Sequence, residues 1–185
     1  DVLENPNPMS ANDPGAGVFG GDPFWVSLQG TAYIGGLHEG SRHRLLVVPK
    51  HFPGRGSSDR LGEQEVATVR KNFEELQQFE LAPFLAVTRE TAVPDAAADG
   101  LLVSHIRYQG FQGNIRAATK PVSFDAQALS LIMNLPDLAG WRENGGLIIS
   151  DDLGTEAVRR FYATGSEFAG RTVARDAFVA GNDML

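Results

Sequence analysis

The sequence contains no cysteine, which excludes disulfide bonds, thiolate catalysis and zinc sites built on cysteine. It also lacks any apolar run long enough to cross a bilayer, so we expect no transmembrane helix and no membrane partner. Basic residues are in deficit, because 16 lysines and arginines stand against 23 acidic residues and give a net charge of −7. A chain of this charge repels phosphate backbones at long range, which argues against nucleic acid as a partner.

The composition that remains is that of one globular domain spanning residues 1–185, with 42% hydrophobic and 21% charged residues. Three short apolar runs predict strands buried on both faces of a parallel sheet. These strands are expected at residues 45–48, 101–103 and 147–149.

Helical patterns lie before, between and after these runs, so the chain is expected to be built of parallel α/β units. The predicted helices cover residues 23–37, 63–80, 125–134, 155–161 and 166–180. Asp22 and Ser166 are the expected N-caps of the first and last helices, and Gly181 is the expected C-cap of the last.

Each predicted strand ends in polar residues. Lys50 and His51 follow the first run, His105 follows the second, and Asp151 with Asp152 follows the third. In parallel α/β folds the loops at the carboxyl ends of the strands meet and carry the active site. The sequence therefore predicts a functional site at this edge of the sheet.

The Asp151–Asp152 pair is the most informative of these ends. Successive residues of a strand point to opposite faces, so only one aspartate can enter a pocket, and we expect it to be Asp151. Asp152 would cap the following helix or pair with a base. A carboxylate near Lys50 and histidines stays ionised, which suits the nucleophile of a glycoside hydrolase.

Two loops add candidate binding residues. Residues 50–60 contain glycines, serines, Arg55 and Arg60, a composition compatible with a phosphate cradle and equally with a turn that shapes a sugar pocket. The loop over residues 105–123 carries Arg107 and Tyr108, and aromatic and guanidinium groups suit the apolar faces and hydroxyl rims of sugars. Both side chains are therefore candidate substrate-binding groups.

A metal site is the alternative reading of the strand ends. His51, His105 and Asp151 have the composition of a two-histidine, one-carboxylate site. Nothing in their spacing requires this arrangement, and Lys50 beside the site would oppose a cation. We therefore expect neither a metal nor another cofactor.

Five segments, in this order and at these spacings, resemble glycoside hydrolase family 3, and within it the bacterial β-N-acetylglucosaminidase branch. They are Lys50-His51-Phe52-Pro53-Gly54, Leu81-Ala82-Pro83-Phe84, Val103-Ser104-His105-Ile106, the stretch over residues 146–153 and Ala180-Gly181-Asn182-Asp183-Met184. The resemblance implies a TIM-type (β/α)8 barrel and a retaining mechanism on β-linked sugars. It also implies that this chain holds the C-terminal part of the barrel, from the fifth strand to the start of the eighth.

The resemblance also implies residue roles. Asp151 would be the nucleophile, Lys50 and His51 would hold sugar hydroxyls, and His105 would lie near them. The acid/base loop departs from the branch pattern, because Arg55 replaces a histidine and no histidine follows Asp59. Asp59 is therefore the candidate for the general acid.

Three alternatives follow from these departures. The chain is either catalytic or a sugar-binding protein or fragment without turnover. Arg55 and Arg60 also fit phosphorolysis, in which inorganic phosphate resolves the intermediate. Because a sheet of three parallel strands leaves bare edges, we expect either a homo-oligomer or a partner segment that completes the barrel.

Overall fold

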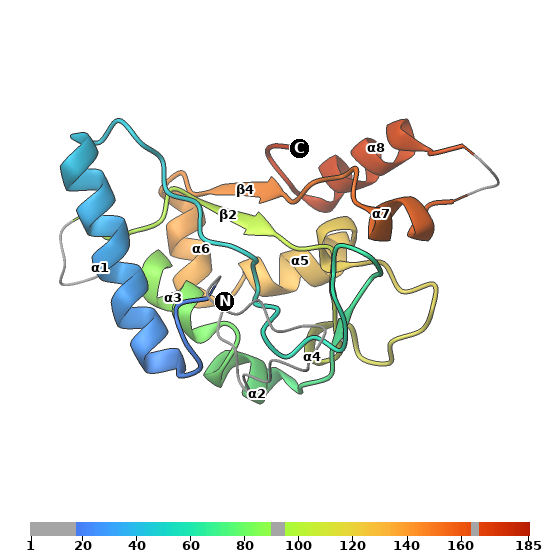
Figure 1. Ribbon diagram of the computed structural model, residues 1–185, viewed down its shortest axis with the longest axis horizontal. Coiled ribbons are helices and arrows are strands. Elements are labelled where there is room, and N and C mark those ends of the chain that lie inside the picture. The colour runs from blue at the N-terminus through green and yellow to red at the C-terminus, as the bar shows by residue number, and fades with distance from the viewer. Residues whose placement is uncertain (1–17, 90–94, 164–166) are drawn as a thin grey trace.

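A computed structural model of the chain describes residues 18–89, 95–163 and 167–185, and shows short parallel strands packed against helices (Figure 1). The helices are α1 (Pro23–Ser41), α2 (Phe73–Gln78), α3 (Ala82–Thr88), α4 (Gln109–Gln112), α5 (Ala126–Met133), α6 (Pro136–Glu143), α7 (Glu156–Phe161) and α8 (Gly170–Ala180), with a 3₁₀ helix, η2, at Val122–Phe124. The strands are β1 (Thr68–Val69), β2 (Gly100–Val103), β3 (Arg107–Tyr108) and β4 (Leu147–Ser150).

The main sheet is parallel, as the sequence predicts. Strand β2 pairs with β4 in a register that sets Val103 opposite Ser150. Phe52 forms a parallel bridge to Val103 on one side, and Met184 forms one to Ile149 on the other. Four stretches of chain therefore run side by side in chain order, while β1 and β3 form a separate parallel pair.

The two predicted strands at residues 101–103 and 147–149 are confirmed as β2 and β4, but no strand forms at residues 45–48. This stretch runs beside β2, since the carbonyl of Val47 accepts from Asp99 N at 3.0 Å and that of Pro49 from Leu102 N at 3.1 Å. Its own donors do not complete a ladder: Val47 N donates to the Asp99 carboxylate at 2.6 Å, and proline has no N–H.

The expectation that the strands are buried on both faces is also wrong. Leu101, Val103 and Ile148 are fully buried against the helices, in the same cluster as Trp141 of α6. Of the residues that alternate with these, Leu102, Leu147 and Ile149 are only partly buried by the described chain. We call this second side, which carries Leu102, Leu147 and Ile149, the open face.

Helix ends follow the capping residues. The carboxylate of Asp22 accepts from Phe24 N at 2.9 Å, and α1 continues to Ser41, four residues past the expected end. Asp125 caps α5 and Thr155 caps α7 through their side chains. Gly181 ends α8 with a φ of +114°. The expected N-cap Ser166 lies outside the described residues, and α8 begins at Gly170.

The predicted helix over residues 63–80 forms only in part, as α2 over Phe73–Gln78, and residues 63–72 are not helical. Its apolar spacing spans two elements, because Thr68 and Val69 pair with β3 as β1 and only then does α2 begin. Asn72 starts α2 through a capping box with Glu75. Pro83 does not end a helix but lies in the first turn of α3, where its missing N–H costs nothing.

The sequence analysis also missed α6, although Pro136 and Asp137 stand in its first turn as helix-start signals. Helices α5 and α6 lie on the same side of β2 and β4 (Figure 1). Trp141 of α6 donates from Nε1 to the Ala98 carbonyl at 2.6 Å, which ties the helix to the start of β2. No helix in residues 18–89, 95–163 or 167–185 is long and apolar enough to cross a membrane.

Buried groups hold the loop that follows Phe52. The Tyr108 hydroxyl donates to the Gly54 carbonyl at 2.8 Å. Gly54 has a φ of +116° and packs closely against Glu80. A Cβ added to Gly54 would lie 2.7 Å from the Glu80 Cβ. Glu80 is buried, accepts a hydrogen bond from Ser57 and pairs with Lys71 Nζ at 3.1 Å. A glycine is therefore required at position 54.

We predict that Gly54→Ala lowers the free energy of unfolding by about 2–4 kcal/mol, because the added carbon meets Glu80 in a backbone region that alanine disfavours. Urea denaturation measures this change. The control is Gly140→Ala in α6, where an added Cβ meets nothing within 4 Å. Equal denaturation midpoints for the two variants would contradict this packing.

A second prediction concerns His38 of α1. Its Nδ1 donates to the Asp95 carbonyl at 2.5 Å and its Nε2 to Asp99 Oδ2 at 2.9 Å, an arrangement that requires the protonated ring. The hydrogen bond to Asp95 raises the pKa of His38, with Asp99 adding to the effect against the opposing effect of burial. The stabilisation is therefore complete below the unfolded pKa of about 6.5 and is lost as pH rises through the higher folded pKa.

We expect stability to fall as pH rises above about 6.5, and His38→Gln to flatten that fall. Thermal or urea unfolding across this pH range measures it. His43→Gln is the control, because the side chain of His43 is 59% exposed and lies 3.6 Å from Asp95. An unchanged slope in His38→Gln would refute the assignment.

Candidate active site

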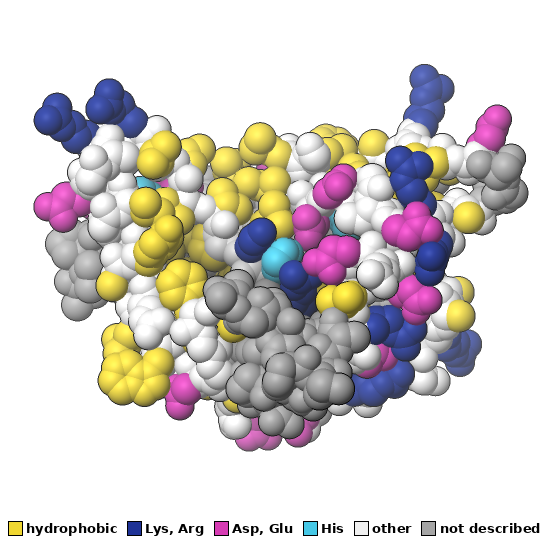
Figure 2. All heavy atoms as spheres, in the orientation of Figure 1, with side chains coloured by type: hydrophobic (Ala, Val, Ile, Leu, Met, Phe, Trp, Pro, Cys, Tyr) yellow, Lys and Arg dark blue, Asp and Glu magenta, His cyan; other side chains and the backbone are white. Residues whose placement is uncertain are grey.

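The candidate site lies at the carboxyl ends of the parallel stretches. The bridge from Phe52 to Val103 and the pairing of Val103 with Ser150 set these ends in one row. Lys50 and His51 therefore lie on the same edge as Asp151, as the sequence predicts. On the face shown in Figure 2, basic and acidic side chains gather around a histidine near the middle of the molecule.

Asp151 follows β4 directly. By the alternation of the strand it shares the open face with Ile149, and it is partly buried. Its backbone N donates to the Val103 carbonyl at 3.0 Å, and its Oδ1 accepts from Asp152 N at 2.8 Å. The main chain thus fixes the carboxylate at the end of the sheet, facing the side that the helices leave open.

Asp152 has a different place. It is exposed, and its Oδ1 accepts from Gly154 N at 2.7 Å, which shapes the turn between β4 and α7. Thr155, not Asp152, caps α7. The prediction that the second aspartate serves the following helix is therefore corrected: its side chain organises the turn before the helix.

His51 lies between charges of both signs. Burial, with the charges of Arg55 and Lys50, lowers the pKa of His51 to about 4, against the opposing effect of Asp151 and Glu63. A histidine of this pKa is neutral near pH 7, so its ring can both donate to and accept from a hydroxyl. Lys50, whose side chain is exposed, adds a positive charge beside it. The Lys50–His51 and Phe52–Pro53 peptide bonds are cis.

His105 is buried, and both of its ring nitrogens have partners. Nε2 donates to the Asp152 carbonyl at 3.1 Å, so Nδ1 accepts from the Ser123 hydroxyl at 2.8 Å. The ring stacks on Phe124 at 5.0 Å, and burial lowers its pKa. His105 therefore supports the turn after Asp151, and the expectation of a direct sugar contact does not fit its burial.

Tyr108 and Arg107 also act within the protein. Tyr108 is fully buried, its hydroxyl lies 3.1 Å from Ser104 Oγ and donates to Gly54, and burial raises its pKa. Arg107 donates to the carbonyls of Thr119 at 2.6 Å and Ala117 at 2.8 Å. Both residues hold loops around the site. Tyr108 is too deeply buried to contact a sugar, whereas a sugar contact by the partly buried Arg107 stays a prediction.

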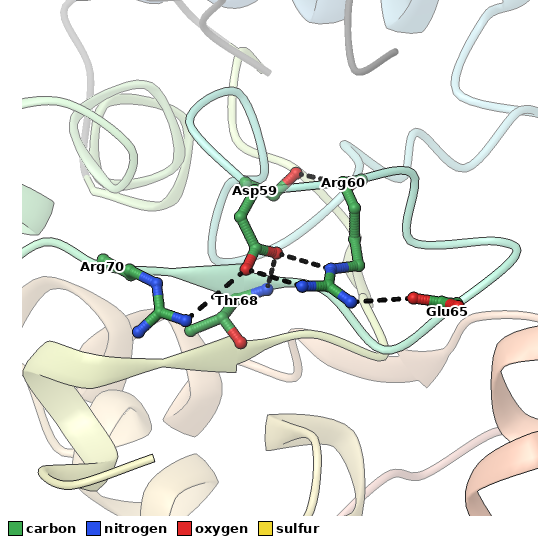
Figure 3. Close-up of polar contacts among 6 residues, drawn as sticks. Asp59, Arg60, Glu65, Thr68 and Arg70 are labelled. Carbon is green, nitrogen blue, oxygen red and sulfur yellow. Dashed lines mark hydrogen bonds and ion pairs between the residues drawn. The ribbon is translucent and has the colours of Figure 1, made fainter. Parts of the chain in front are cut away.

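The carboxylate of Asp59, the predicted general acid, contacts groups of its own loop and of β1. Its Oδ1 accepts from Thr68 N at 2.8 Å and from Arg60 Nε at 3.2 Å, and Oδ2 lies 3.8 Å from Arg70 (Figure 3). These contacts tie the loop to β1.

Glu63 is the residue that the sequence analysis missed. Its carboxylate forms an ion pair with Arg55 Nη1, and its backbone carbonyl accepts from Ala157 N in α7 at 3.0 Å. It also belongs to the charges around His51. The predicted helix over residues 63–80 hid it, because that helix would have carried Glu63 away from the strand ends.

A cavity of about 230 Å³ adjoins Lys50 and His51. Its other walls are mainly apolar and come from α1, α3 and the stretch before Lys50, including Ile34, Val48 and Phe84. Within the described ranges, no three His, Asp or Glu side chains are grouped so that they could hold a metal ion. An apolar wall beside polar groups suits one face of a sugar ring.

Comparison with known proteins identifies the family of the chain. The sequence model described as "Glycosyl hydrolase family 3 N terminal domain" matches residues 5–185. A β-hexosaminidase from Xylella fastidiosa is 30% identical over 142 residues, which are 77% of this chain and 36% of that protein. A β-hexosaminidase from Hydrogenovibrio crunogenus is 26% identical and is covered over 35% of its length. The chain thus spans about a third of these relatives.

Solved structures show the same fold. A fungal multi-domain family 3 β-N-acetylglucosaminidase superposes on the whole chain with a TM-score of 0.77 and 27% identity, over 19% of its own length. A family 3 β-N-acetylglucosaminidase from Paenibacillus gives 0.75 at 23% identity, over 30% of its length. A β-glucoside phosphorylase also gives 0.75, at 19% identity and 30% coverage. Because the family model matches nearly the whole of this chain, the chain belongs to glycoside hydrolase family 3, in its β-N-acetylglucosaminidase-like branch.

Proposed function

We propose that this chain carries the catalytic centre of a retaining glycoside hydrolase that acts on β-linked sugars, with Asp151 as the nucleophile. The observation that carries the proposal is the place of Asp151: a backbone-fixed carboxylate at the end of β4, on the open face and in the field of His51. An ionised, positioned carboxylate is what attack on an anomeric carbon requires.

The reaction has two steps. A carboxylate oxygen of Asp151 bonds to the anomeric carbon as the glycosidic C–O bond breaks and the leaving oxygen gains a proton. Water then attacks the same carbon, loses a proton and releases Asp151. Neutral His51 and cationic Lys50 would hold hydroxyls of the sugar beside the reacting carbon.

The substrate class follows from the relatives. Because the β-hexosaminidases and β-N-acetylglucosaminidases match this chain, we expect β-N-acetylglucosaminides to be preferred, with β-glucosides as the second class. Phosphorolysis is less favoured, because Arg55 is paired with Glu63 and its charge is partly neutralised. Turnover that requires inorganic phosphate would restore that alternative.

The barrel is the second part of the proposal. The parallel order of residues 47–52, β2, β4 and residues 183–184 is that of consecutive strands of a (β/α)8 barrel, of which this chain would hold the C-terminal part. The open face carries the half-buried Leu102 and Ile149, and Leu46 beside it is 70% exposed. A second copy of the chain or the remaining barrel strands would cover these residues.

Asp151→Asn is expected to lower kcat/KM on aryl β-N-acetylglucosaminides by at least about 1,000-fold, because an amide cannot form the glycosyl ester. Steady-state kinetics with a panel of aryl glycosides measures it. Asp152→Asn is the matched control, since an amide oxygen can still accept from Gly154 N. Full activity in Asp151→Asn would refute the nucleophile, and glycan binding without turnover in the unaltered chain would favour a sugar-binding protein.

Sedimentation velocity tests the assembly. We expect the isolated chain to sediment faster as its concentration rises, because self-association buries the apolar open face. Leu46→Lys should shift this equilibrium toward the monomer, whereas Leu131→Lys on α5, at another exposed leucine, should not. A monomer at every concentration would contradict self-association and leave the remaining barrel strands as the cover.

A further inference from the structure

The general acid is the missing part of the proposed site, and the structure brings a second carboxylate to it. Glu63 lies in the loop after Gly54, where it pairs with Arg55. The hydrogen bond from Ala157 N to the Glu63 carbonyl pins this loop to the first turn of α7, six residues after Asp151. Two loops that are distant in sequence thus bring Glu63 and Asp151 to the surroundings of one side chain, His51.

Solvent exposure also favours Glu63 over Asp59 as the general acid. Its side chain is 52% exposed, while the partner guanidinium of Arg55 is only 21% exposed. The ion pair therefore holds the Glu63 side chain at a place that solvent reaches. Asp59 is only 24% exposed, and Thr68 N, Arg60 and Arg70 surround its oxygens.

We propose that Glu63 is the proton donor and acceptor of the reaction and that Arg55 is its positioning residue; this inference rests on the proposed function with Asp151 as nucleophile. In the first step the Glu63 carboxyl gives its proton to the glycosidic oxygen as that C–O bond breaks and the bond from Asp151 to the anomeric carbon forms. In the second step the Glu63 carboxylate takes a proton from water as the water oxygen bonds to the anomeric carbon and the ester bond to Asp151 breaks. No other reactant is needed.

Arg55 lowers the pKa of the Glu63 carboxyl. Burial raises the pKa of Glu63, but the hydrogen bond from Arg55, a backbone hydrogen bond and the charges of Arg55 and His51 together lower it below its usual value. The resting carboxylate is thus the form suited to accept a proton from water. Protonation for the first step becomes easier as pH falls, so substrates that need an acid should be cleaved best on the acidic side of neutrality.

The test compares leaving groups. Glu63→Gln keeps an acceptor for Arg55 but cannot transfer a proton. We expect kcat/KM to fall by about 10²–10⁴-fold on alkyl or oligosaccharide β-glycosides, and far less on dinitrophenyl β-glycosides, whose leaving group needs no proton. Azide should then restore turnover of the dinitrophenyl substrate and give a β-glycosyl azide, because azide attacks without a general base.

Two controls separate this role from a structural one. Glu65→Gln changes a nearby carboxylate that is also 52% exposed but pairs with Arg60 and Arg160, and it should retain activity on both substrates without azide rescue. Asp59→Asn tests the alternative acid. If Asp59 only stabilises its loop, Asp59→Asn should lower kcat/KM by the same factor for both leaving groups.

The outcomes are distinct. A Glu63→Gln variant as active as the unaltered chain on alkyl glycosides, or equally impaired on both substrates and without an azide product, would overturn the role of Glu63. Azide rescue in Asp59→Asn instead would assign the acid to Asp59. No turnover of dinitrophenyl glycosides by the unaltered chain would overturn the proposed function itself.

Discussion

The parallel pairing of β2 with β4 is the interaction on which the rest of the site depends. Its register sets Val103 opposite Ser150, and the Phe52 bridge extends the same alignment to the stretch that carries Lys50 and His51. Because parallel strands end on the same edge, residues about a hundred positions apart in sequence become neighbours there. Every proposed catalytic role rests on this alignment.

Buried polar groups convert the alignment into a defined site. His105 joins Ser123 to the turn after Asp151, and Tyr108 joins Ser104 to Gly54 in the loop after His51. These groups are desolvated, so each hydrogen bond that is left unmade would cost about 1–3 kcal/mol. His105 and Tyr108, which the sequence analysis counted among the sugar-binding groups, are buried and instead hold the loops around the candidate site.

The sequence predicted what depends on local chemistry and missed what depends on distant contacts. The caps at Asp22 and Gly181 and the strands β2 and β4 follow from neighbouring residues, and they are confirmed. A continuous helix over residues 63–80 does not form, because Thr68 and Val69 pair with β3. The local sequence pattern does not reveal this pairing. Glu63 was missed for the same reason, since only the folded chain brings it beside Arg55 and α7.

The central claim is that Asp151 becomes covalently attached to a sugar. Activated fluoroglycosides slow the second step of a retaining reaction and trap the glycosyl-enzyme, so intact-protein mass followed by peptide mapping tests the claim most directly. We expect a mass increase of one sugar, mapped to Asp151, with one member of a glucose and N-acetylglucosamine panel. A folded chain with no adduct, or an adduct on another residue, would contradict it.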